Sequence, residues 1–394
     1  MIKLVSDTID NKDIDNLINW LKNYPRLTKG ELTLNLEDKW SNWLGTEYSI
    51  FCNSGSSANL LMLWALVEAN KISQNSKIVI PSLSWATDLA PVIQLGMTPI
   101  LCDCNLEDLS VDLNHLEDLF KNTQPEVLLL VSVLGLVPNM EKIVNLCDKY
   151  NVILLEDTCE SMGAEFNGKK LGTFGLMSSF STYFGHHIST IEGGFVSTSD
   201  KELHEILKSI RSHGWDRDAA PQYGKQLRDK WNISDFDSLY TFYHSGFNLR
   251  STDLQAFIGL EQIDKLDKIC KKRNKNFNSY TKELKGLSSW DNLNKRGFIS
   301  NMAYPIIHKN RNEIVNNLQK QNIEVRPLIC GSIGNQPFYV KQYGKKEFFN
   351  VSQIDKYGFY IPNHPDLKKS DILKITNIIK DSVIEKLDPY LQTR

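Results

Sequence analysis

The chain has 394 residues, of which 41% are hydrophobic and 23% are charged, and its formal net charge is -2. This composition is typical of a globular protein, and the near-neutral balance gives no general attraction to nucleic acid or to an anionic membrane. The N-terminus carries no apolar signal segment, and the longest apolar run, residues 127–137, is too short to cross a bilayer.

The first half of the chain changes from helical spacing to an alternation of short apolar runs with longer amphipathic segments. Apolar periodicity predicts strands over 48–52, 77–81, 98–102, 127–133, 152–157, 177–180 and 194–198, and helices over 8–23, 32–44, 58–69, 113–121 and 140–150. Strands separated by helices imply crossover connections and an α/β fold whose mostly parallel sheet is covered on both faces. Ligands of such sheets bind beyond the carboxyl ends of the strands.

A long helical pattern over residues 252–284 precedes a more mixed segment that runs to the C-terminus. We therefore predict a large domain over residues 1–261 and, over residues 262–394, a connecting helix with a smaller α+β domain.

The heptad NSGSSAN, residues 53–59, follows a predicted strand and opens a predicted helix. Gly55 permits a close backbone approach, and Ser56 and Ser57 supply hydroxyls where the helix amides point outward, which suits an anion pocket. A plain serine N-cap is the favoured interpretation of the heptad alone. A Walker-type nucleotide site is not expected, because the chain has no Gly-Lys-Ser/Thr segment here.

Two further motifs place an aromatic ring and two carboxylates beyond predicted strand ends. Trp85, in PSLSWAT, could lie against a planar heterocycle, although a loop tryptophan more often serves packing. Glu156 and Asp157 end an apolar run in LLEDTCESMG, where buried carboxylates need partners. Asp157 could hold a proton on a pyridine nitrogen or cap a helix, and the residues alone leave both roles open.

Adjacent histidines, His186 and His187, lie in SSFSTYFGHHISTIEGG, a segment that predicts a short strand-turn-strand unit. No lysine lies between Lys170 and Lys201. Histidines in such a segment are usually structural, and two adjacent ones rarely form a metal site without carboxylate or cysteine ligands at matching spacing.

The seven cysteines are an odd number without the spacing of a disulfide framework, which favours reduced thiols and a cytoplasmic location. Cys102 and Cys104 form a lone C-x-C segment, whereas a structural metal site normally needs about four ligands. We therefore expect no metal site.

Taken in order, these segments resemble the DegT/DnrJ/EryC1/StrS aminotransferase family, whose cofactor-binding segment reads approximately S-F-x-x-x-K-N-I/L-x-x-x-E-G-G. Counting back from Glu192, the lysine position of the family falls on His186. The resemblance extends from GELTLNLEDKW to GFNLR and implies an aspartate-aminotransferase-like fold. It also implies the lysine-free branch of the family, the 3-dehydratases of nucleotide-linked 4-keto-6-deoxysugars, with a GDP-linked 4-keto-6-deoxymannose as the expected substrate.

The resemblance implies a pyridoxal 5'-phosphate or pyridoxamine 5'-phosphate cofactor that is held without a covalent bond, because histidine cannot form the bond that lysine forms. His186 would be the catalytic base, and L-glutamate would restore the amine form of the cofactor. The implied cofactor contacts are Gly55, Ser56 and Ser181 at the phosphate, Trp85 and Glu160 at the ring, and Asp157 at the pyridine nitrogen.

Two loops and one segment of the C-terminal part supply the remaining implied residues. Asn248, in GFNLR, matches a family residue that reaches the cofactor phosphate of a partner subunit, so a homodimer with active sites at its interface is implied. The expected substrate contacts are His213, Arg217, Arg250 and Arg326.

One related 3-dehydratase type carries a [2Fe-2S] cluster bound by closely spaced cysteines downstream of this segment. No cysteine lies between Cys159 and Cys270 here, so we expect no iron-sulfur cluster. Two alternatives stay open: a nucleotide-sugar aminotransferase that works around the missing lysine, and a catalytically silent cofactor-binding regulator on the same fold.

Overall fold

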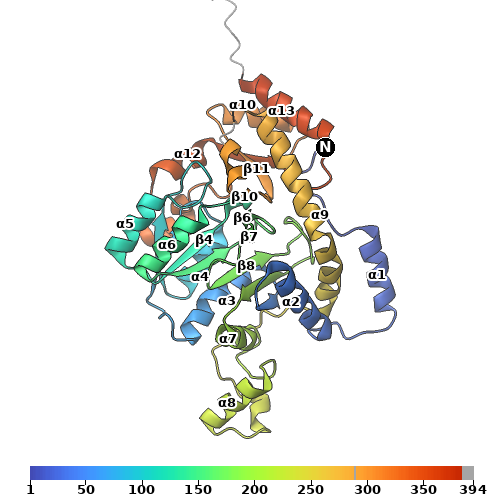
Figure 1. Ribbon diagram of the computed structural model, residues 1–394, viewed down its shortest axis with the longest axis vertical. Helices are drawn as coiled ribbons and strands as arrows, with labels where there is room; N and C mark the ends of the chain where they lie inside the picture. The colour runs from blue at the N-terminus through green and yellow to red at the C-terminus, as the bar shows by residue number, and fades with distance from the viewer. Residues whose placement is uncertain (288–289, 384–394) are drawn as a thin grey trace, which may run out of the picture.

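The computed structural model describes residues 1–287 and 290–383 and contains one large sheet, two small sheets and the helices that cover them (Figure 1). The large sheet has the strand order β1-β9-β8-β5-β4-β2-β3. Its strands are β1 Tyr48–Cys52, β2 Lys77–Pro81, β3 Thr98–Cys102, β4 Val127–Val131, β5 Ile153–Asp157, β8 Met177–Ser181 and β9 Gly194–Thr198. Only β9 runs against its neighbours in this sheet, which confirms the predicted α/β class with a mostly parallel sheet.

Helices connect the strands and cover the sheet. They are α1 Asn11–Leu21, α2 Glu31–Leu44, α3 Gly55–Glu68, α4 Ala86–Gln94, α5 Leu113–Thr123, α6 Met140–Tyr150, α7 Lys201–Arg211, α8 Pro221–Trp231, α9 Asp253–Glu283, α10 Arg311–Lys320, α11 Pro337–Tyr343, α12 Phe349–Tyr357 and α13 Lys369–Val383. Short 3-10 turns are η1 Val133–Gly135, η2 Asp237–Tyr240, η3 Trp290–Lys295 and η4 Ile333–Asn335. No helix within the described ranges is long and apolar enough to span a membrane.

The position of β4 explains why its residues are all apolar. Leu128 and Leu130 pack into the core on the side of α5, α6 and the C-terminal elements, whereas Val127 and Leu129 pack among α3, α4 and α7 on the other side. Successive strand side chains point to opposite faces, so both faces of this strand are buried and neither can be polar.

Several predicted boundaries differ from the structure, as in the helix predicted over 58–69, which begins at Gly55, and two further differences lie around the carboxyl edge of the sheet. The strand predicted over 127–133 ends at Val131, because Leu134 takes a left-handed φ of 51° in the turn η1 and breaks the extended run. The predicted short strand-turn-strand unit is two antiparallel strands, β8 and β9, joined by the longer loop 182–193. Both differences lie where the chain leaves the sheet to line a cavity.

The C-terminal part forms a separate three-stranded sheet from β11 Ala303–Ile307, β13 Gly358–Pro362 and β12 Arg326–Pro327. The third sheet joins β6 Glu165–Phe166, β7 Lys169–Lys170 and β10 Gly297–Phe298. Helix α9 runs along one side of the molecule from α2 toward α13, and α8 lies at the opposite end of the long axis (Figure 1). Residues from α9 and β11 can thus reach the edge of the large sheet.

Candidate active site

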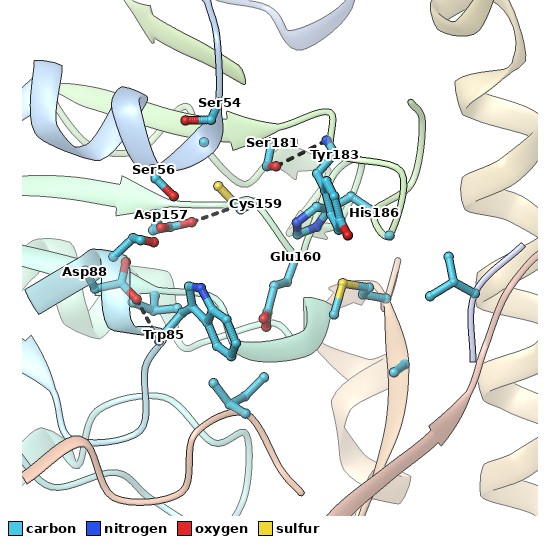
Figure 2. Close-up of a pocket in the computed structure, with 18 of the residues that line it drawn as sticks. Ser54, Ser56, Trp85, Asp88, Asp157, Cys159, Glu160, Ser181, Tyr183 and His186 are labelled. Atoms are coloured by element: carbon cyan, nitrogen blue, oxygen red, sulfur yellow. Dashed lines mark hydrogen bonds between the residues drawn. The ribbon is translucent and has the colours of Figure 1, made fainter. Parts of the chain in front are cut away.

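A cavity of about 510 Å³ lies at the carboxyl edge of the large sheet, where β1, β2, β5 and β8 end. Parallel strands end together at one edge, so turns far apart in sequence converge there. The wall brings together these residues singled out in the sequence: Gly55, Ser56, Trp85, Asp157, Glu160, Ser181 and His186 (Figure 2).

One end of the cavity is built by the N-terminus of α3. Ser54 is the N-cap, and its hydroxyl accepts a hydrogen bond from the Ser57 amide at 3.1 Å. A Cβ atom at Gly55 would lie 2.7 Å from Cβ of Ser181 and 2.9 Å from the Cys159 sulfur, so only glycine permits this close packing. Free amides at a helix N-terminus, with the hydroxyls of Ser56 and Ser181 nearby, suit a phosphate group.

The two adjacent carboxylates at the end of β5 point into different surroundings. Asp157 lines the cavity, where its Oδ2 accepts a hydrogen bond from Asn59 Nδ2 at 2.6 Å. Glu156 is fully buried away from the cavity and accepts backbone N–H bonds from Gly172, Phe174 and Gly175 at 2.7–2.8 Å. Asp157 is therefore available to a ligand, whereas Glu156 holds the following turn together.

Trp85 and Glu160 lie on the side of the cavity opposite the helix terminus (Figure 2). The indole of Trp85 is 55% exposed, an unusual state for so large an apolar ring, and it offers a flat wall. Glu160 accepts a hydrogen bond from the Leu134 amide at 2.6 Å. Burial raises the pKa of Glu160 to about 7 despite this bond, with a further contribution from the charge of Asp157.

His186 and His187 have opposite environments although they are neighbours in the sequence. His186 lines the cavity, and its Nδ1 atom has no hydrogen-bond partner. Its pKa falls to about 4, chiefly because burial disfavours the charged ring and partly because Arg273 lies close, while the carboxylate of Asp157 acts in the opposite direction. His187 is fully buried and its Nε2 lies 3.0 Å from the carbonyl and the hydroxyl of Ser300.

Arg273, on α9, is a buried part of the wall that the sequence analysis did not single out. Its guanidinium donates to the carbonyls of His186 at 3.1 Å, Met302 at 2.8 Å and Asn363 at 2.6 Å. It thus ties the loop that carries His186 to the small sheet. Among the described residues that line the cavity there is no lysine.

Five of the expected residues lie outside this cavity: Asn248, His213, Arg217, Arg250 and Arg326. The first four form one group around Trp215, in which Arg250 Nε donates to Asn248 Oδ1 at 3.1 Å and the Arg217 guanidinium lies 4.1 Å from the centre of the Trp215 ring. Arg326 is exposed on β12. In the pairing of β12 with β13 it lies opposite Tyr360, which does line the cavity.

Several residues of the wall were not predicted from the sequence. Asp88 directly follows the motif PSLSWAT and lies in the wall, and Asn59, which ends NSGSSAN, supports the wall through bonds to Asp88 and Asp157, so their polar character beside a strand end was a usable signal. Leu4, Val5 and Met302 reach the wall from the N-terminus and from β11. Their positions depend on long-range packing, such as the bond from the Leu4 amide to Glu324 at 2.9 Å, and no local pattern marks them.

The described residues contain no group of three or more histidine, cysteine, aspartate or glutamate side chains placed to hold a metal ion. The cavity instead fits a pyridoxal-type cofactor on its own features. A helix N-terminus with hydroxyls, a flat exposed indole and an acceptor carboxylate match the phosphate, the ring and the pyridine nitrogen. The unpartnered Nδ1 of His186 is a buried polar atom that a ligand could satisfy.

Comparison with known proteins gives the same picture over nearly the whole chain. GDP-4-keto-6-deoxy-D-mannose 3-dehydratase of Yersinia pseudotuberculosis is 32% identical over 387 residues, which cover 96% of this chain and 98% of that protein. A structure of the Escherichia coli GDP-4-keto-6-deoxy-D-mannose-3-dehydratase with bound hydrated PLP aligns with a TM-score of 0.88 at 30% identity, covering 96% of this chain and 99% of the other.

A second solved structure, GDP-4-keto-6-deoxymannose-3-dehydratase with a trapped PLP-glutamate geminal diamine, also has a TM-score of 0.88, at 29% identity, and covers 96% of this chain and all of the other. These likenesses confirm the predicted aminotransferase-type fold. Residues 7–380 match the sequence model of the DegT/DnrJ/EryC1/StrS aminotransferase family, and the chain belongs to that family.

Proposed function

We propose that this chain is a pyridoxamine-phosphate-dependent 3-dehydratase of a nucleotide-linked 4-keto-6-deoxyhexose, with GDP-4-keto-6-deoxymannose as the substrate and glutamate as the amino donor. The observation that carries the proposal is His186, an imidazole with an unpartnered Nδ1 in a cofactor-shaped cavity whose described wall has no lysine. The similar 3-dehydratases, one of them with bound PLP and one with a PLP-glutamate adduct, support the same assignment.

Different residues of the cavity would bind different parts of the cofactor. The α3 N-terminus with Ser56 and Ser181 would hold the cofactor phosphate, Trp85 would cover the ring, and Asp157 would pair with the ring nitrogen. Glu160 would contact the edge of the ring beside Trp85. The bound cofactor supplies the amine that condenses with the 4-keto group and a ring that accepts electrons.

His186 would move the protons of the reaction. Because burial lowers its pKa to about 4, the imidazole is neutral at pH 7 and free to accept a proton from C4' of the cofactor. It could then return that proton to the departing C3 hydroxyl. Arg273 would keep the imidazole in place through the His186 carbonyl. Water would then hydrolyse the 4-amino group of the dehydrated sugar and release ammonia, and the cofactor would stay non-covalently bound because histidine cannot form the covalent bond that lysine makes.

The group around Trp215 supports a homodimer. Asn248, His213, Arg217 and Arg250 lie together outside the cavity of their own chain, and we infer that they serve the cofactor phosphate and the substrate of a partner subunit. Arg326 would reach the substrate from beside Tyr360.

We also propose that residues 1–261 act as the cofactor domain and residues from 262 onward as the smaller domain. The large sheet contains only strands that precede α9 in the chain, and the sheet of β11, β12 and β13 only strands that follow it, which supports this division.

The test is to incubate the purified protein with pyridoxal phosphate, glutamate and GDP-4-keto-6-deoxymannose. We expect release of 2-oxoglutarate and ammonia and a sugar product that has lost one oxygen. The CDP- and dTDP-linked sugars, assayed in parallel, establish which nucleotide is preferred.

Two other outcomes would favour the alternatives. A sugar that keeps the amino group would indicate an aminotransferase. Bound cofactor without any change in the sugar, for all three nucleotides, would indicate a regulator. The variant His186→Lys serves as a matched comparison, because we expect it to bind the cofactor covalently, with the absorbance of an ordinary aminotransferase, and to lose dehydration.

A further inference from the structure

Two buried carboxyl groups share one amide beneath the cavity. Asn59, on α3, donates from Nδ2 to Asp157 Oδ2 at 2.6 Å and to Asp88 Oδ1 at 3.1 Å. Asp88 is 1% exposed and Asp157 is 6% exposed. The amide of Asn59 therefore joins two carboxyl groups of the cavity wall, which also contact each other directly.

Asp88 makes a second contact that reaches the other side of the site. Its Oδ2 accepts a hydrogen bond from the backbone amide of Trp85 at 2.9 Å, at the start of α4 (Figure 2). The backbone that carries the exposed indole is thus bonded to the same carboxyl group that contacts Asn59. One side chain links the two residues that we place at the cofactor ring.

Asp88 is surrounded by acidic groups and forms no salt bridge within the described residues. The titratable groups that face it are the carboxyls of Asp157 and Glu160 and the thiols of Cys159 and Cys330. No lysine, arginine or histidine within residues 1–287 and 290–383 pairs with it.

Two buried negative charges without a cation are strongly unfavourable, so one of the two carboxyls should keep its proton. Burial first, and then the charge of Asp157, raise the pKa of Asp88 well above its ordinary value. Asp88 is therefore the one expected to stay neutral, while the carboxyl group of Asp157 faces the ligand.

We propose that Asp88 is a positioning residue of the cofactor site, which holds Asp157 through Asn59 and holds Trp85 through its backbone, in the arrangement that the cofactor ring requires. The proposal rests on the proposed function only in its choice of ligand. The geometry that carries it, one carboxyl group bonded both to Asn59 and to the backbone of Trp85, belongs to the chain itself.

The first experiment measures the affinity of the full-length protein for pyridoxamine phosphate, by quenching of tryptophan fluorescence. We expect Asp88→Ala to weaken binding by about tenfold or more, because it removes both contacts. Asp88→Asn should stay within about threefold of the wild type, because its amide oxygen can still accept from the Trp85 amide and its NH2 group can donate to Asp157, as a neutral carboxyl group does.

Asp112→Ala is the matched control, since Asp112 caps α5 outside the cavity through the His115 amide. It should lose helix-cap stability without losing affinity. Unchanged affinity in Asp88→Ala, with the wild type binding normally, would overturn the positioning role. Absence of binding by the wild type would count against the proposed function instead.

The second experiment follows thermal unfolding of the cofactor-free protein as a function of pH and involves no turnover. A carboxyl group with a raised pKa in the folded chain holds its proton while the unfolded chain releases it, so stability is lost as the pH rises above about 4. Asp88→Asn removes this loss. We expect its melting temperature to gain about 2 °C or more on the wild type between about pH 5 and about pH 8.

If the difference in melting temperature between Asp88→Asn and the wild type stays constant with pH, Asp88 is ionised at little cost. That result would overturn the neutral form of Asp88 on which the proposal depends. This result is independent of cofactor and substrate, so it separates the positioning role from the identity of the reaction.

Discussion

The cavity and the interior directly behind it contain the same residue types, used in opposite ways. Asp157 and His186 face the cavity, whereas their neighbours Glu156 and His187 point into the protein. Glu156 accepts three backbone N–H bonds, and His187 is bonded to Ser300. Asp157 is bonded as well, to Asn59 and to the Cys159 amide, and both histidines keep an unpartnered Nδ1, so hydrogen-bond satisfaction does not separate the two pairs. Their position does: the side chains of Asp157 and His186 line the cavity, where a ligand can reach them, whereas those of Glu156 and His187 are enclosed by the chain.

The largest expected effect tests the histidine pair. His186→Asn should lower dehydration by about 10³-fold or more, because asparagine cannot accept and return a proton at neutral pH. The stability and the cofactor content should stay near those of the wild type, since the side chain lines a cavity. Measuring sugar product by mass spectrometry, with cofactor content by absorbance, checks both statements.

His187→Asn is the matched comparison for that experiment. Its ring lies in the interior, so we expect turnover to persist at a reduced stability. Full dehydration by His186→Asn, or a comparable loss in both variants, would remove the distinction between the two positions.

The carboxylate pair gives the next largest effect, on stability. Glu156→Ala would leave three backbone N–H groups without their acceptor, and we expect a loss of about 3 kcal/mol or more in the free energy of unfolding. Asp157→Ala should cost far less in the cofactor-free protein and should weaken cofactor binding instead. Urea unfolding of both variants without cofactor decides between these outcomes. Equal losses would mean that Asp157 is structural as well.

The local part of this arrangement was readable in the sequence. The strands predicted over 48–52, 77–81, 98–102 and 194–198 and the helix over 140–150 have the observed boundaries, because polar or turn residues end each apolar run. Asn139 caps that helix through the Lys142 amide, and Asn151 ends it with a left-handed φ of 54°.

The rest depended on contacts between distant segments. Whether His186 or His187 faces the cavity is decided by packing against Ser300 and Arg273, each about a hundred residues away in the chain. From the sequence, residues 182–193 look like a short turn. The bonds that hold them as a longer loop, such as that from the Ser189 amide to Gln262, come from segments far away in the chain, so no local pattern shows them. Periodicity reports which residues are buried, but it does not report which partner buries them.

The close packing at the phosphate end of the cavity predicts a smaller effect. In Gly55→Ala the new Cβ would lie within 2.9 Å of Cβ of Ser181 and the Cys159 sulfur, so β8 or α3 must shift. We expect a loss of about 1–3 kcal/mol in stability and weaker binding of pyridoxamine phosphate. Gly224→Ala is the control, because in α8 the nearest atoms belong to the flexible side chains of Arg228 and Asp216. An unchanged affinity in Gly55→Ala would place the phosphate elsewhere.

The smallest expected effect concerns the pH dependence of stability, and it compares the two histidines once more. Burial holds the pKa of His187 well below its ordinary value, because a second proton on the unpartnered Nδ1 would have no acceptor. The unfolded chain therefore takes up a proton first as the pH falls below about 6.5, and the wild type loses up to about 1.4 kcal/mol of stability per pH unit from this residue.

His187→Asn removes that loss, although at neutral pH it gives up the contacts with Ser300. The stability difference between wild type and variant, measured by urea unfolding without cofactor, should thus shrink by about 1 kcal/mol between about pH 6.5 and about pH 5.5. For His186→Asn the direction is the same and the change over this range is of similar size, because a folded-state pKa of about 4 also leaves the ring neutral down to about pH 5.5. A clearly smaller change for His186 than for His187 would mean that the cavity leaves the charged ring well hydrated, and that burial contributes little to the neutral form of the imidazole that we assign to proton transfer.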